Sequence, residues 1–548
     1  MKLLQELTRR QHQQGWLSDE TLQSISAEWN VPLFRLEELV SFYTHFRREP
    51  PKPTTVNFCR DVCCQLIDGP SLREEFLELI AGRDDIEVQE VSCLGRCDHV
   101  PAVAVNGQVV SLPKPATPEH LLYLIDQPEK ISEDQRTSAT HSWESDPYST
   151  KEEQYSTVRS LVEKQADLAA TCISELNSAG LQGMGGAGFP AGRKWEFVAA
   201  EPSEAKYVIC NADESEPGTF KDREILSQHP HLVIEGMLLA GLTIHAEQGI
   251  LFIRHEYEPE RKAFELALEH ARSLGILGEN AAGSGKRFDV EIFVSPGGYI
   301  LGEETALLEA LEDKRGEPRN KPPYPGTHGL WGKPTLINNV ETFAWATTII
   351  HRGADWWNSH GVNGAKGRKF VCISGDVKTP GVFEIPLGTR VNELIEMAGG
   401  MQDGKQLLAF LPGGASSNFL PADKADTPLD FTAMQQAGSM LGTGAVIVFA
   451  EDRDLFAMAS NLVKFFRNES CGKCVPCRVG SQHTVEMLDG IDAGKRSSQS
   501  LSQLPDLGDT LEQTSICGLG QVALNPILSL LKHFPDLVAE RTGFRPVN

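Results

Sequence analysis

The fold is decided by one glycine-rich stretch, GMGGAGFPAGRKW at residues 183–195. Five of its first ten residues are glycine, which lets the backbone take positive φ and approach a ligand closely because no Cβ stands in the way. Successive backbone N–H groups in such a loop form an anion-binding concavity, and Lys194 adds a charge suited to a phosphate. Phe189 and Trp195 are apolar rings on which a heterocycle can stack. We therefore expect a phosphate-binding loop rather than a flexible linker, since linkers rarely carry Phe, Trp and Lys so close together.

The same stretch contains G-x-G-x-x-G at Gly183, Gly185 and Gly188, which is a weak signal when it stands alone. The usual dinucleotide fingerprint follows a β-strand. The residues before this loop, Leu161 to Leu176, instead have apolar positions at helical spacing. The sequence therefore predicts a phosphate-binding loop in a fold other than the usual dinucleotide-binding one.

The composition is that of an acidic globular protein. The chain has 548 residues, is 40% hydrophobic and carries a net charge of −24, and its length predicts about three to five domains. The negative charge argues against binding to nucleic acid or anionic membranes. No run of about 18 apolar residues occurs, and the first residues lack the apolar core of a signal peptide. We expect a cytoplasmic protein without membrane insertion.

Eight of the twelve cysteines fall into two groups with the spacing of metal ligands. A disulfide framework is disfavoured in a long acidic chain without a signal sequence. In the first group Cys59 and Cys64 give C-x4-C, and Cys93 and Cys97 give C-x3-C. Two loops that each supply two thiolates match a [2Fe–2S] cluster, whereas zinc sites usually show C-x2-C pairs. Cys63 remains the less favoured alternative to Cys64.

The second group consists of Cys471, Cys474 and Cys477, with Cys517 forty residues later. This C-x2-C-x2-C…C pattern favours a [4Fe–4S] cluster, because three close thiolates reach three corners of one cluster and a remote thiolate completes it. The surrounding residues 453–548 are predicted to be helical.

The rest of the chain divides by composition and pattern. Residues 1–48 are predicted to form a helical bundle with Ser18 as an N-cap, and residues 49–127 a thioredoxin-like α/β domain. Residues 128–155 are polar without apolar periodicity, which predicts an exposed linker. Residues 351–452 alternate short strands and turns, which predicts a ubiquitin-like, SLBB-type module that acts as a spacer.

The remaining domain, residues 156–350, has polar residues after its predicted strands. NADESEPGTFKDR at 211–223 follows one strand and GGYILGEET at 297–305 follows another. Amides and carboxylates at the carboxyl ends of strands are typical of ligand sites in open α/β sheets, because they bond a heterocycle edge or hydroxyl groups. We therefore expect a ligand site at this edge of the sheet, with KPPYP at 321–325 as a stiff neighbouring loop.

These motifs resemble the flavin-carrying subunit of respiratory complex I and of related soluble NAD-linked oxidoreductases. The resemblance rests on the stretches at 183–195 and 211–223, on GEETAL at 302–307, on NNVET at 338–342 and on the C-terminal cysteines. The first 130 residues resemble the thioredoxin-like [2Fe–2S] partner subunit of the same complex, so the two are fused here. The resemblance implies a multidomain α/β and α+β protein whose residues 156–350 form a Rossmann-like FMN- and NAD-binding domain.

The resemblance also implies a cofactor site without a catalytic side chain, because the flavin itself exchanges the hydride. It implies that FMN is held by Gly183, Gly185, Gly186, Lys194, Asn211, Asp213, Glu214, Gly302, Glu303, Asn338 and Asn339. It implies that NAD(H) stacks on the flavin in a site lined by Phe189, Phe197, Glu216, Tyr299, Glu304, Lys321 and Tyr324. The carboxylate of Glu304 is implied to repel a 2′-phosphate, so that NAD is preferred over NADP.

Two positions depart from the complex I pattern, since Met184 and Tyr324 stand where Arg and Phe are usual. The fused form and Met184 together are most similar to the β subunits of soluble molybdenum- or tungsten-dependent formate dehydrogenases. The [4Fe–4S] cluster is expected to be the flavin's immediate partner and the [2Fe–2S] cluster a side reservoir or second port.

No motif for a pterin or a nickel–iron centre occurs, so we expect a catalytic α subunit that carries a Mo/W-pterin and further iron–sulfur clusters, in a heterodimer or larger assembly. The alternatives are the diaphorase subunit of an NAD-reducing hydrogenase, a fused NADH-oxidising subunit of a complex I-like enzyme, and a non-catalytic zinc-binding scaffold.

Overall fold

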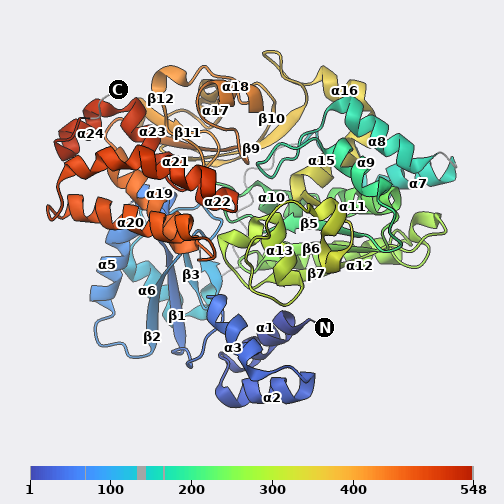
Figure 1. The fold of residues 1–548 in the computed structure, drawn as a ribbon, viewed down its shortest axis with the longest axis horizontal. Coiled ribbons are helices and arrows are strands. Elements are labelled where there is room, and N and C mark those ends of the chain that lie inside the picture. Colours follow the sequence, from blue (N-terminus) through green and yellow to red (C-terminus); the bar gives the residue numbers. More distant parts are fainter. Residues whose placement is uncertain (1, 68, 111, 132–142, 165–166, 546–548) are drawn as a thin grey trace.

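The computed structural model describes residues 2–67, 69–110, 112–131, 143–164 and 167–545. Four parts follow one another along the chain (Figure 1): N-terminal helices with a small α/β domain, in blue; a larger α/β domain, in green; a β-rich module, in orange; and a helical C-terminal part, in red. This arrangement confirms the predicted mixture of α/β and helical parts.

Three helices open the chain and pack against the larger α/β domain. Ser18 is the N-cap of the second helix, since its Oγ accepts the backbone N–H of Thr21, as predicted. Tyr43 Oη donates to the carbonyl of Lys314 at 2.6 Å, and the N–H of Leu4 donates to Asp313 Oδ1 at 2.8 Å. The helices are α1 (Leu3–Gln14), α2 (Asp19–Trp29) and α3 (Leu33–Phe42).

The small α/β domain is built on a four-stranded sheet of order β2-β1-β3-β4. Its first two strands are parallel, and β3 and β4 form the predicted hairpin around Asn106 and Gly107. The elements are β1 (Thr54–Cys59), α4 (Val62–Leu66), α5 (Gly69–Leu79), β2 (Ile86–Val91), β3 (Val103–Val105), β4 (Gln108–Val110) and α6 (Pro118–Asp126).

The connection at 128–155 differs from the predicted exposed linker in its second half. Residues 132–142 lie outside the described residues. Trp143, Tyr148 and Tyr155 are buried, so the expectation of exposure is wrong for residues 143–155. Their polar composition conceals three large rings, which gain free energy when they leave water. Only short 3₁₀ turns occur in its described part, η1 (Pro128–Lys130) and η2 (Lys151–Glu153).

The larger α/β domain has a parallel four-stranded sheet of order β7-β6-β5-β8. Its strands are β5 (Tyr207–Ala212), β6 (Gln248–Arg254), β7 (Asp289–Ser295) and β8 (Thr335–Asn339). Its helices are α7 (Ser156–Glu163), α8 (Leu168–Ala179), α9 (Ala191–Ala200), α10 (Lys221–Gln228), α11 (Pro230–Ile244), α12 (Glu258–Ser273), α13 (Glu304–Leu311), α14 (Pro325–His328), α15 (Val340–Arg352) and α16 (Ala354–Ser359). The single helix predicted from Leu161 to Leu176 is wrong, because Asp167 begins a new helix by accepting the N–H of Ala170.

The β-rich module has a five-stranded sheet of order β10-β9-β13-β11-β12. Its elements are β9 (Arg368–Gly375), β10 (Gly381–Pro386), α17 (Val391–Met397), β11 (Leu407–Leu411), β12 (Leu420–Pro421), α18 (Phe431–Gln436) and β13 (Ala445–Ala450). The C-terminal helices are α19 (Leu455–Glu469), α20 (Val475–Asp492), α21 (Leu504–Thr514), α22 (Gly518–Val522), α23 (Asn525–His533) and α24 (Pro535–Thr542).

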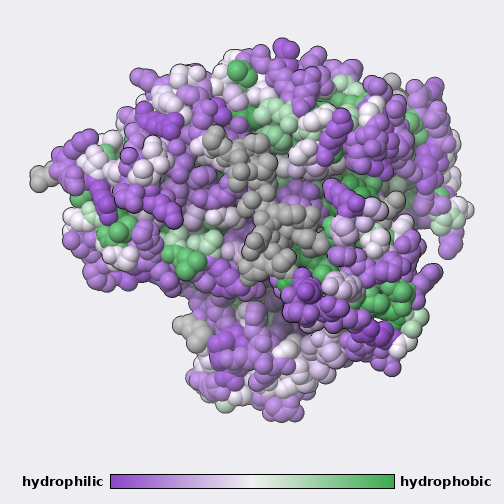
Figure 2. Space-filling view, turned by 180° about the vertical axis from the view of Figure 1, so that it is seen from behind, coloured by the Kyte–Doolittle hydropathy of each residue, from purple (hydrophilic) through white to green (hydrophobic). Residues whose placement is uncertain are grey.

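The surface is largely hydrophilic. The face in Figure 2 shows small hydrophobic patches scattered among polar residues. Among the described residues, no helix combines the length and hydropathy needed to cross a bilayer.

Candidate cofactor site

The glycine-rich loop joins α8 to α9 and folds over the end of β8. The N–H of Gly183 donates to the carbonyl of Phe189 at 2.9 Å, which closes the loop. Gly186 and Gly188 have φ of +115° and +67°, values that glycine takes without strain. A Cβ on Gly185 would lie 3.1 Å from the Cβ of Asn339. The loop backbone therefore lies against the strand end that supplies the predicted amides.

Predicted FMN residues from three strand ends meet beneath this loop. Asn211 Nδ2, after β5, donates to the carbonyl of Gly302 at 2.8 Å. Ser295, at the end of β7, donates to Asp213 Oδ2 at 2.7 Å. Burial raises the pKa of Asp213 to about 6. Because β5, β7 and β8 are parallel, their carboxyl ends lie at one edge of the sheet, as predicted.

Lys194 and the amides of β8 complete this group. Lys194 Nζ donates to the carbonyl of Ile337 at 3.1 Å, and burial lowers its pKa. Asn338 Oδ1 accepts the indole N–H of Trp195 at 3.1 Å, and Asn339 caps α15 by accepting the N–H of Glu341. Helix α9 thus carries a cation and an indole to the strand end.

Glu214 faces a different environment from the other predicted FMN residues. Its carboxylate accepts the N–H of Asp222 at 2.9 Å and the hydroxyl of Tyr257 at 3.0 Å. Burial raises its pKa to about 7. Its side chain therefore holds the start of α10 in place rather than facing the glycine-rich loop.

A buried cluster of four charges lies under the loop. Lys221 Nζ lies 2.6 Å from Asp222 Oδ1 and 3.1 Å from Glu341 Oε2, and Lys369 Nζ lies 3.0 Å from the same Glu341 oxygen. Burial opposes the charge of Lys221, but the two carboxylates hold its pKa above its usual range. Lys369 Nζ also lies 3.6 Å from the sulfur of the buried Met184. An arginine at position 184 would add a second cation there, which gives a physical reason for methionine.

The predicted nicotinamide residues form an exposed rim beside the loop. Phe189, Phe197 and Tyr324 are 44%, 51% and 59% exposed, although large aromatic side chains are usually mostly buried. Lys321 Nζ lies 2.9 Å from Glu303 Oε1 and 3.1 Å from Glu304 Oε1. This rim combines ring faces with paired charges, which suits a ligand that has a heterocycle and phosphates.

Tyr299 and Glu216 are brought together on a more enclosed side. Tyr299 Oη donates to Glu216 Oε2 at 2.6 Å, and the N–H of Ser416 donates to Glu216 Oε1 at 2.6 Å. The Tyr299 ring packs edge-on against Phe465 of α19. Burial raises the pKa of Glu216, and the nearby Cys93 thiolate adds to the rise.

The five cysteines of the small α/β domain gather in one buried group. Cys93 Sγ lies 3.5 Å from Cys97 Sγ, and Cys59 contacts Cys64 and Cys93. Backbone N–H groups point at three sulfurs: Ala102 at Cys64 (3.4 Å), Gly95 at Cys93 (3.4 Å) and Gly218 at Cys97 (3.3 Å). N–H donors directed at sulfur suit thiolate ligands, so the sulfurs of Cys59, Cys64, Cys93 and Cys97 fit a [2Fe–2S] cluster.

Cys63 lies beside this group but has different partners. It contacts Cys97, and its sulfur lies 3.4 Å from the hydroxyl of Ser374 in β9. A thiol and a hydroxyl can share a proton at this distance. The N–H of Ala102 that points at Cys64 therefore favours Cys64 over Cys63 as the ligand.

Buried arginines clamp the Cys93–Cys97 loop onto the larger domain. Arg223 Nη2 lies 2.6 Å from Asp98 Oδ2, and Arg223 Nη1 donates to the carbonyl of Gly95 at 2.7 Å. Arg254 donates to the carbonyl of Cys93. A Cβ on Gly95 would lie 2.6 Å from the Tyr257 ring, so glycine permits this close approach.

The second cysteine group lies at the starts of two helices. Cys474 is the N-cap of α20 and Cys517 the N-cap of α22. Burial raises the pKa of Cys477 to about 11, and the neighbouring Cys474 and Cys471 thiolates add to the rise. Burial likewise raises the pKa of Cys517 to about 12, with Glu303 and Cys471 close enough to contribute. The four thiols converge beside a predicted FMN residue, which fits a [4Fe–4S] cluster.

One carboxylate joins the three parts of the site. Glu469, at the end of α19 and just before Cys471, accepts the N–H of Tyr299 at 2.8 Å. Its other oxygen accepts the hydroxyl of Ser92, which precedes Cys93. The two cysteine loops and the Tyr299 loop are therefore held to one side chain.

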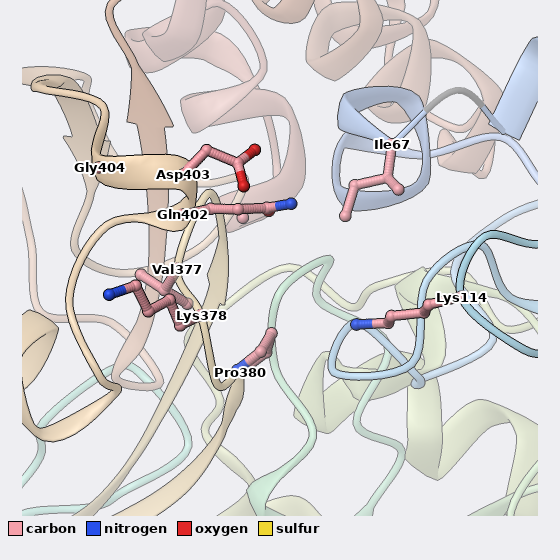
Figure 3. A pocket seen from close by; sticks show the side chains of 9 residues that line it. Ile67, Lys114, Val377, Lys378, Pro380, Gln402, Asp403 and Gly404 are labelled. Carbon is pink, nitrogen blue, oxygen red and sulfur yellow. The ribbon is translucent and has the colours of Figure 1, made fainter.

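The cavity in Figure 3 lies elsewhere, between the small α/β domain and the β-rich module. Its volume is about 430 Å³. It is lined by Ile67, Lys114, Gly375, Val377, Lys378, Pro380, Gln402, Asp403 and Gly404. None of these is a predicted cofactor residue.

Sequence reasoning missed several residues that shape the site. The predicted spacer module supplies Ser416 to Glu216 and Lys369 to Glu341. Neither residue has a local sequence signal, because each acts across many residues of chain. Glu469 stands two residues before Cys471, and an acid so close to a cluster motif could have been singled out.

The fold and the site define a flavin- and iron–sulfur-binding electron-transfer protein, and the comparisons with known proteins agree. The Nuo51 FMN-binding domain matches residues 176–347, the thioredoxin-like [2Fe–2S] ferredoxin domain residues 1–127, the SLBB domain residues 370–419, and the iron–sulfur binding region of NADH-ubiquinone oxidoreductase-F residues 457–541. The predicted FMN, [2Fe–2S] and [4Fe–4S] domains are thereby confirmed.

Two curated relatives illustrate the range of the similarity. The second F-type protein of NADH-quinone oxidoreductase in Rhizobium meliloti is 42% identical over 69% of this chain and 89% of its own length. The NADP-reducing hydrogenase protein HndC of Solidesulfovibrio fructosivorans is 41% identical over 67% of this chain and 75% of its own.

A solved structure matches almost the whole chain. A chain of an NAD⁺-reducing [NiFe]-hydrogenase in the H₂-reduced state is 31% identical, with a TM-score of 0.85 over 99% of this chain and 93% of its own. The chain belongs to the family of the F-type proteins of NADH-quinone oxidoreductase, here fused to a thioredoxin-like [2Fe–2S] domain. It is an oxidoreductase subunit that exchanges electrons with NAD(H).

Proposed function

We propose that this chain is the NAD-reducing end of a multi-subunit enzyme that oxidises formate at a Mo/W-pterin site in a partner subunit. The observation that carries the electron path is Glu469, which holds Tyr299 and both cysteine loops together. The fused arrangement and the buried Met184 support the formate dehydrogenase assignment through their resemblance to its β subunits.

We propose that FMN is held by the predicted residues at the carboxyl edge of the sheet. FMN, when bound, exchanges two electrons with nicotinamide as a hydride and passes them singly to iron–sulfur clusters. In this proposal the N–H groups of the glycine-rich loop and Lys194 bind the phosphate, and Asn211 and Asp213 bond the rest of the cofactor. Glu214 acts indirectly, because its carboxylate holds the start of α10.

We propose that NAD(H) binds to the exposed rim of Phe189, Phe197 and Tyr324. The carboxylate of Glu304, paired with Lys321 at 3.1 Å, would stand near the ribose and repel a 2′-phosphate. The name of HndC states that its enzyme reduces NADP, so coenzyme choice needs its own test.

We propose that the [4Fe–4S] cluster receives electrons next to the flavin, because Cys517 lies near Glu303. The [2Fe–2S] cluster would be a side reservoir or second port. Its Cys97 accepts the N–H of Gly218 in the 211–223 loop, so this reservoir would also adjoin the flavin site. The domain divisions at 48, 127, 155, 350 and 452, and a cytoplasmic location, are part of the same proposal.

A second candidate partner is a hydrogenase. The match to a chain of an NAD⁺-reducing [NiFe]-hydrogenase covers 99% of this chain, including the fused N-terminal domain. In that case hydrogen rather than formate would supply the electrons.

One anaerobic experiment separates the two partners. The native complex is purified through this chain, and its visible spectrum is followed after addition of formate, hydrogen or NADH. Bleaching of flavin and clusters by formate supports the formate dehydrogenase assignment, and bleaching by hydrogen transfers it to a hydrogenase. Bleaching by NADH alone, with the partner subunit shown to be present, would contradict both.

A further inference from the structure

Three potential metal ligands meet outside the cofactor site, where the 128–155 connection contacts α11. Asp146 lies in the connection, and His229 and His231 flank Pro230 at the start of α11. Asp146 Oδ2 lies 3.3 Å from His229 Nδ1 and 3.1 Å from His231 Nε2. All three ligand atoms lie within 4.8 Å of one another.

The two imidazoles have nitrogen atoms without hydrogen-bond partners. His231 is 5% exposed, and its Nε2 makes no hydrogen bond in spite of the short distance to Asp146. Both ring nitrogens of His229 are buried without a hydrogen-bond partner. The nitrogens thus approach the carboxylate at a distance typical of a hydrogen bond but without its directionality, and a buried polar atom without a partner is costly.

The same distances suit ligands around one metal ion. Zinc binds imidazole nitrogen and carboxylate oxygen at about 2.0–2.2 Å in tetrahedral geometry, which places neighbouring ligand atoms about 3.3 Å apart. The observed separations of 3.1 and 3.3 Å match this spacing. An ion pair between protonated imidazole and carboxylate would instead need the N–H to point at the oxygen.

The surroundings hold the carboxylate in position. Asp146 Oδ1 accepts the N–H of Tyr148 at 3.0 Å, which leaves Oδ2 for the imidazoles. The carbonyl of Asp146 accepts a guanidinium N–H of Arg352 at 3.2 Å. The Trp143 ring lies 5.7 Å from the His229 ring, centroid to centroid. Partners that fix the orientation of ligands are a usual feature of protein metal sites.

We propose that Asp146, His229 and His231 bind one divalent transition-metal ion of the zinc class, with water completing the coordination. The ion joins the connection that follows the small α/β domain to the first turn of α11. Its role is structural, because the flavin, NAD and cluster residues lie in other parts of the chain. This inference does not depend on the identity of the catalytic partner.

The test is metal analysis of the full-length, iron-replete protein after incubation with Zn²⁺ and desalting. We expect one zinc per chain in addition to full cluster iron. X-ray absorption at the zinc edge should show only nitrogen and oxygen neighbours at about 2.0–2.2 Å, and no sulfur at about 2.3 Å. A sulfur shell would place the zinc on the cluster cysteines and overturn the proposal.

Variants assign the ligands. Asp146→Asn and His231→Gln should each lose the zinc while they retain full FMN and iron. His351→Gln is the matched control, because this histidine packs against the same Tyr148 ring and bonds Thr157 but offers no atom to the cluster. The control should keep the zinc. If His231→Gln fails to fold, Asp146→Asn decides, and retention of stoichiometric zinc in a folded Asp146→Asn protein would overturn the proposal.

Discussion

The two cysteine groups are attached to the flavin domain in different ways. The Cys93–Cys97 loop is held by buried charges, chiefly Arg223 against Asp98. The Cys471–Cys477 segment is held by the aromatic contact of Tyr299 with Phe465, and by a bond from Lys473 Nζ to the carbonyl of Pro318 at 2.7 Å. The first group is fully buried, whereas Cys471 and Cys474 are only half-buried.

This difference teaches that one site is completed by the flavin domain and the other largely by its own helices. The N–H of Gly218 reaches Cys97 across the domain boundary. Cys474 and Cys517 instead sit at the starts of their own helices, α20 and α22. Changes at the domain boundary should therefore damage the first site more than the second.

The largest expected effect is at the second site. Cys517→Ala removes one of its four thiols and should leave reduction of the flavin by NADH intact while electron transfer onward to the partner falls to background. Stopped-flow spectra and partner-linked activity measure the two steps. Cys172→Ala, a buried cysteine of α8 outside both groups, is the control. Persistent onward transfer in Cys517→Ala would remove this cluster from the path.

The clamp of the first site should fail next. Arg223→Met leaves Asp98 buried without its ion-pair partner, which costs about 3–5 kcal/mol. Calorimetry should show early unfolding of the small α/β domain, with loss of the [2Fe–2S] signal in electron paramagnetic resonance and retention of the [4Fe–4S] signal. Arg287→Met, at an exposed pair with Glu279, should cost at most about 1 kcal/mol. Parallel loss of both cluster signals would break the comparison.

A buried carboxylate makes the same half of the molecule sensitive to pH. Glu235 accepts the N–H of Val158 at 2.9 Å, and burial raises its pKa from 4.5 to about 7. The folded state then binds more protons than the unfolded state between these values, so stability falls as pH rises through this window. The loss amounts to at most about 3 kcal/mol.

Glu235→Gln should remove this pH dependence, because an amide does not titrate and Tyr148 can then donate to Thr157. Thermal unfolding of both proteins from pH 5 to pH 8 measures the difference. An equal pH slope in wild type and variant would show that Glu235 is not the group responsible.

The smallest expected effect concerns coenzyme choice at the rim. Glu304→Gln removes the charge proposed to repel a 2′-phosphate and leaves Lys321 free of one partner. The ratio of NADPH to NADH activity should rise about tenfold, equivalent to about 1.4 kcal/mol. Glu196→Gln, an exposed acid of α9, tests whether net charge alone changes the ratio. An unchanged ratio in Glu304→Gln would contradict the proposed role.

Local signals predicted much of this molecule. The glycine-rich loop, the hairpin at Asn106 and the cap at Ser18 all depend on residues close in sequence. The cysteine spacing predicted both cluster domains for the same reason. The alternation of strands and helices also predicted which parts are α/β and which are helical.

What the sequence could not show depends on distant contacts. Arg223 and Asp98 are 125 residues apart, and nothing near either one predicts the pair. Lys369 and Ser416 belong to a module that looked like a spacer, yet both reach the flavin domain. The burial of Trp143 was hidden by its polar neighbours, because burial depends on the surface against which a side chain packs.

The shared carboxylate of Glu469 has a consequence for protein engineering. A chimera that takes its first domain from a relative must bring a hydroxyl at position 92 and an acid at position 98, or it loses partners of Glu469 and Arg223. A transplanted C-terminal domain must likewise present a carboxylate to the backbone of Tyr299. The units of this chain are therefore not interchangeable cassettes, and recombination succeeds only when both sides of each boundary are exchanged together.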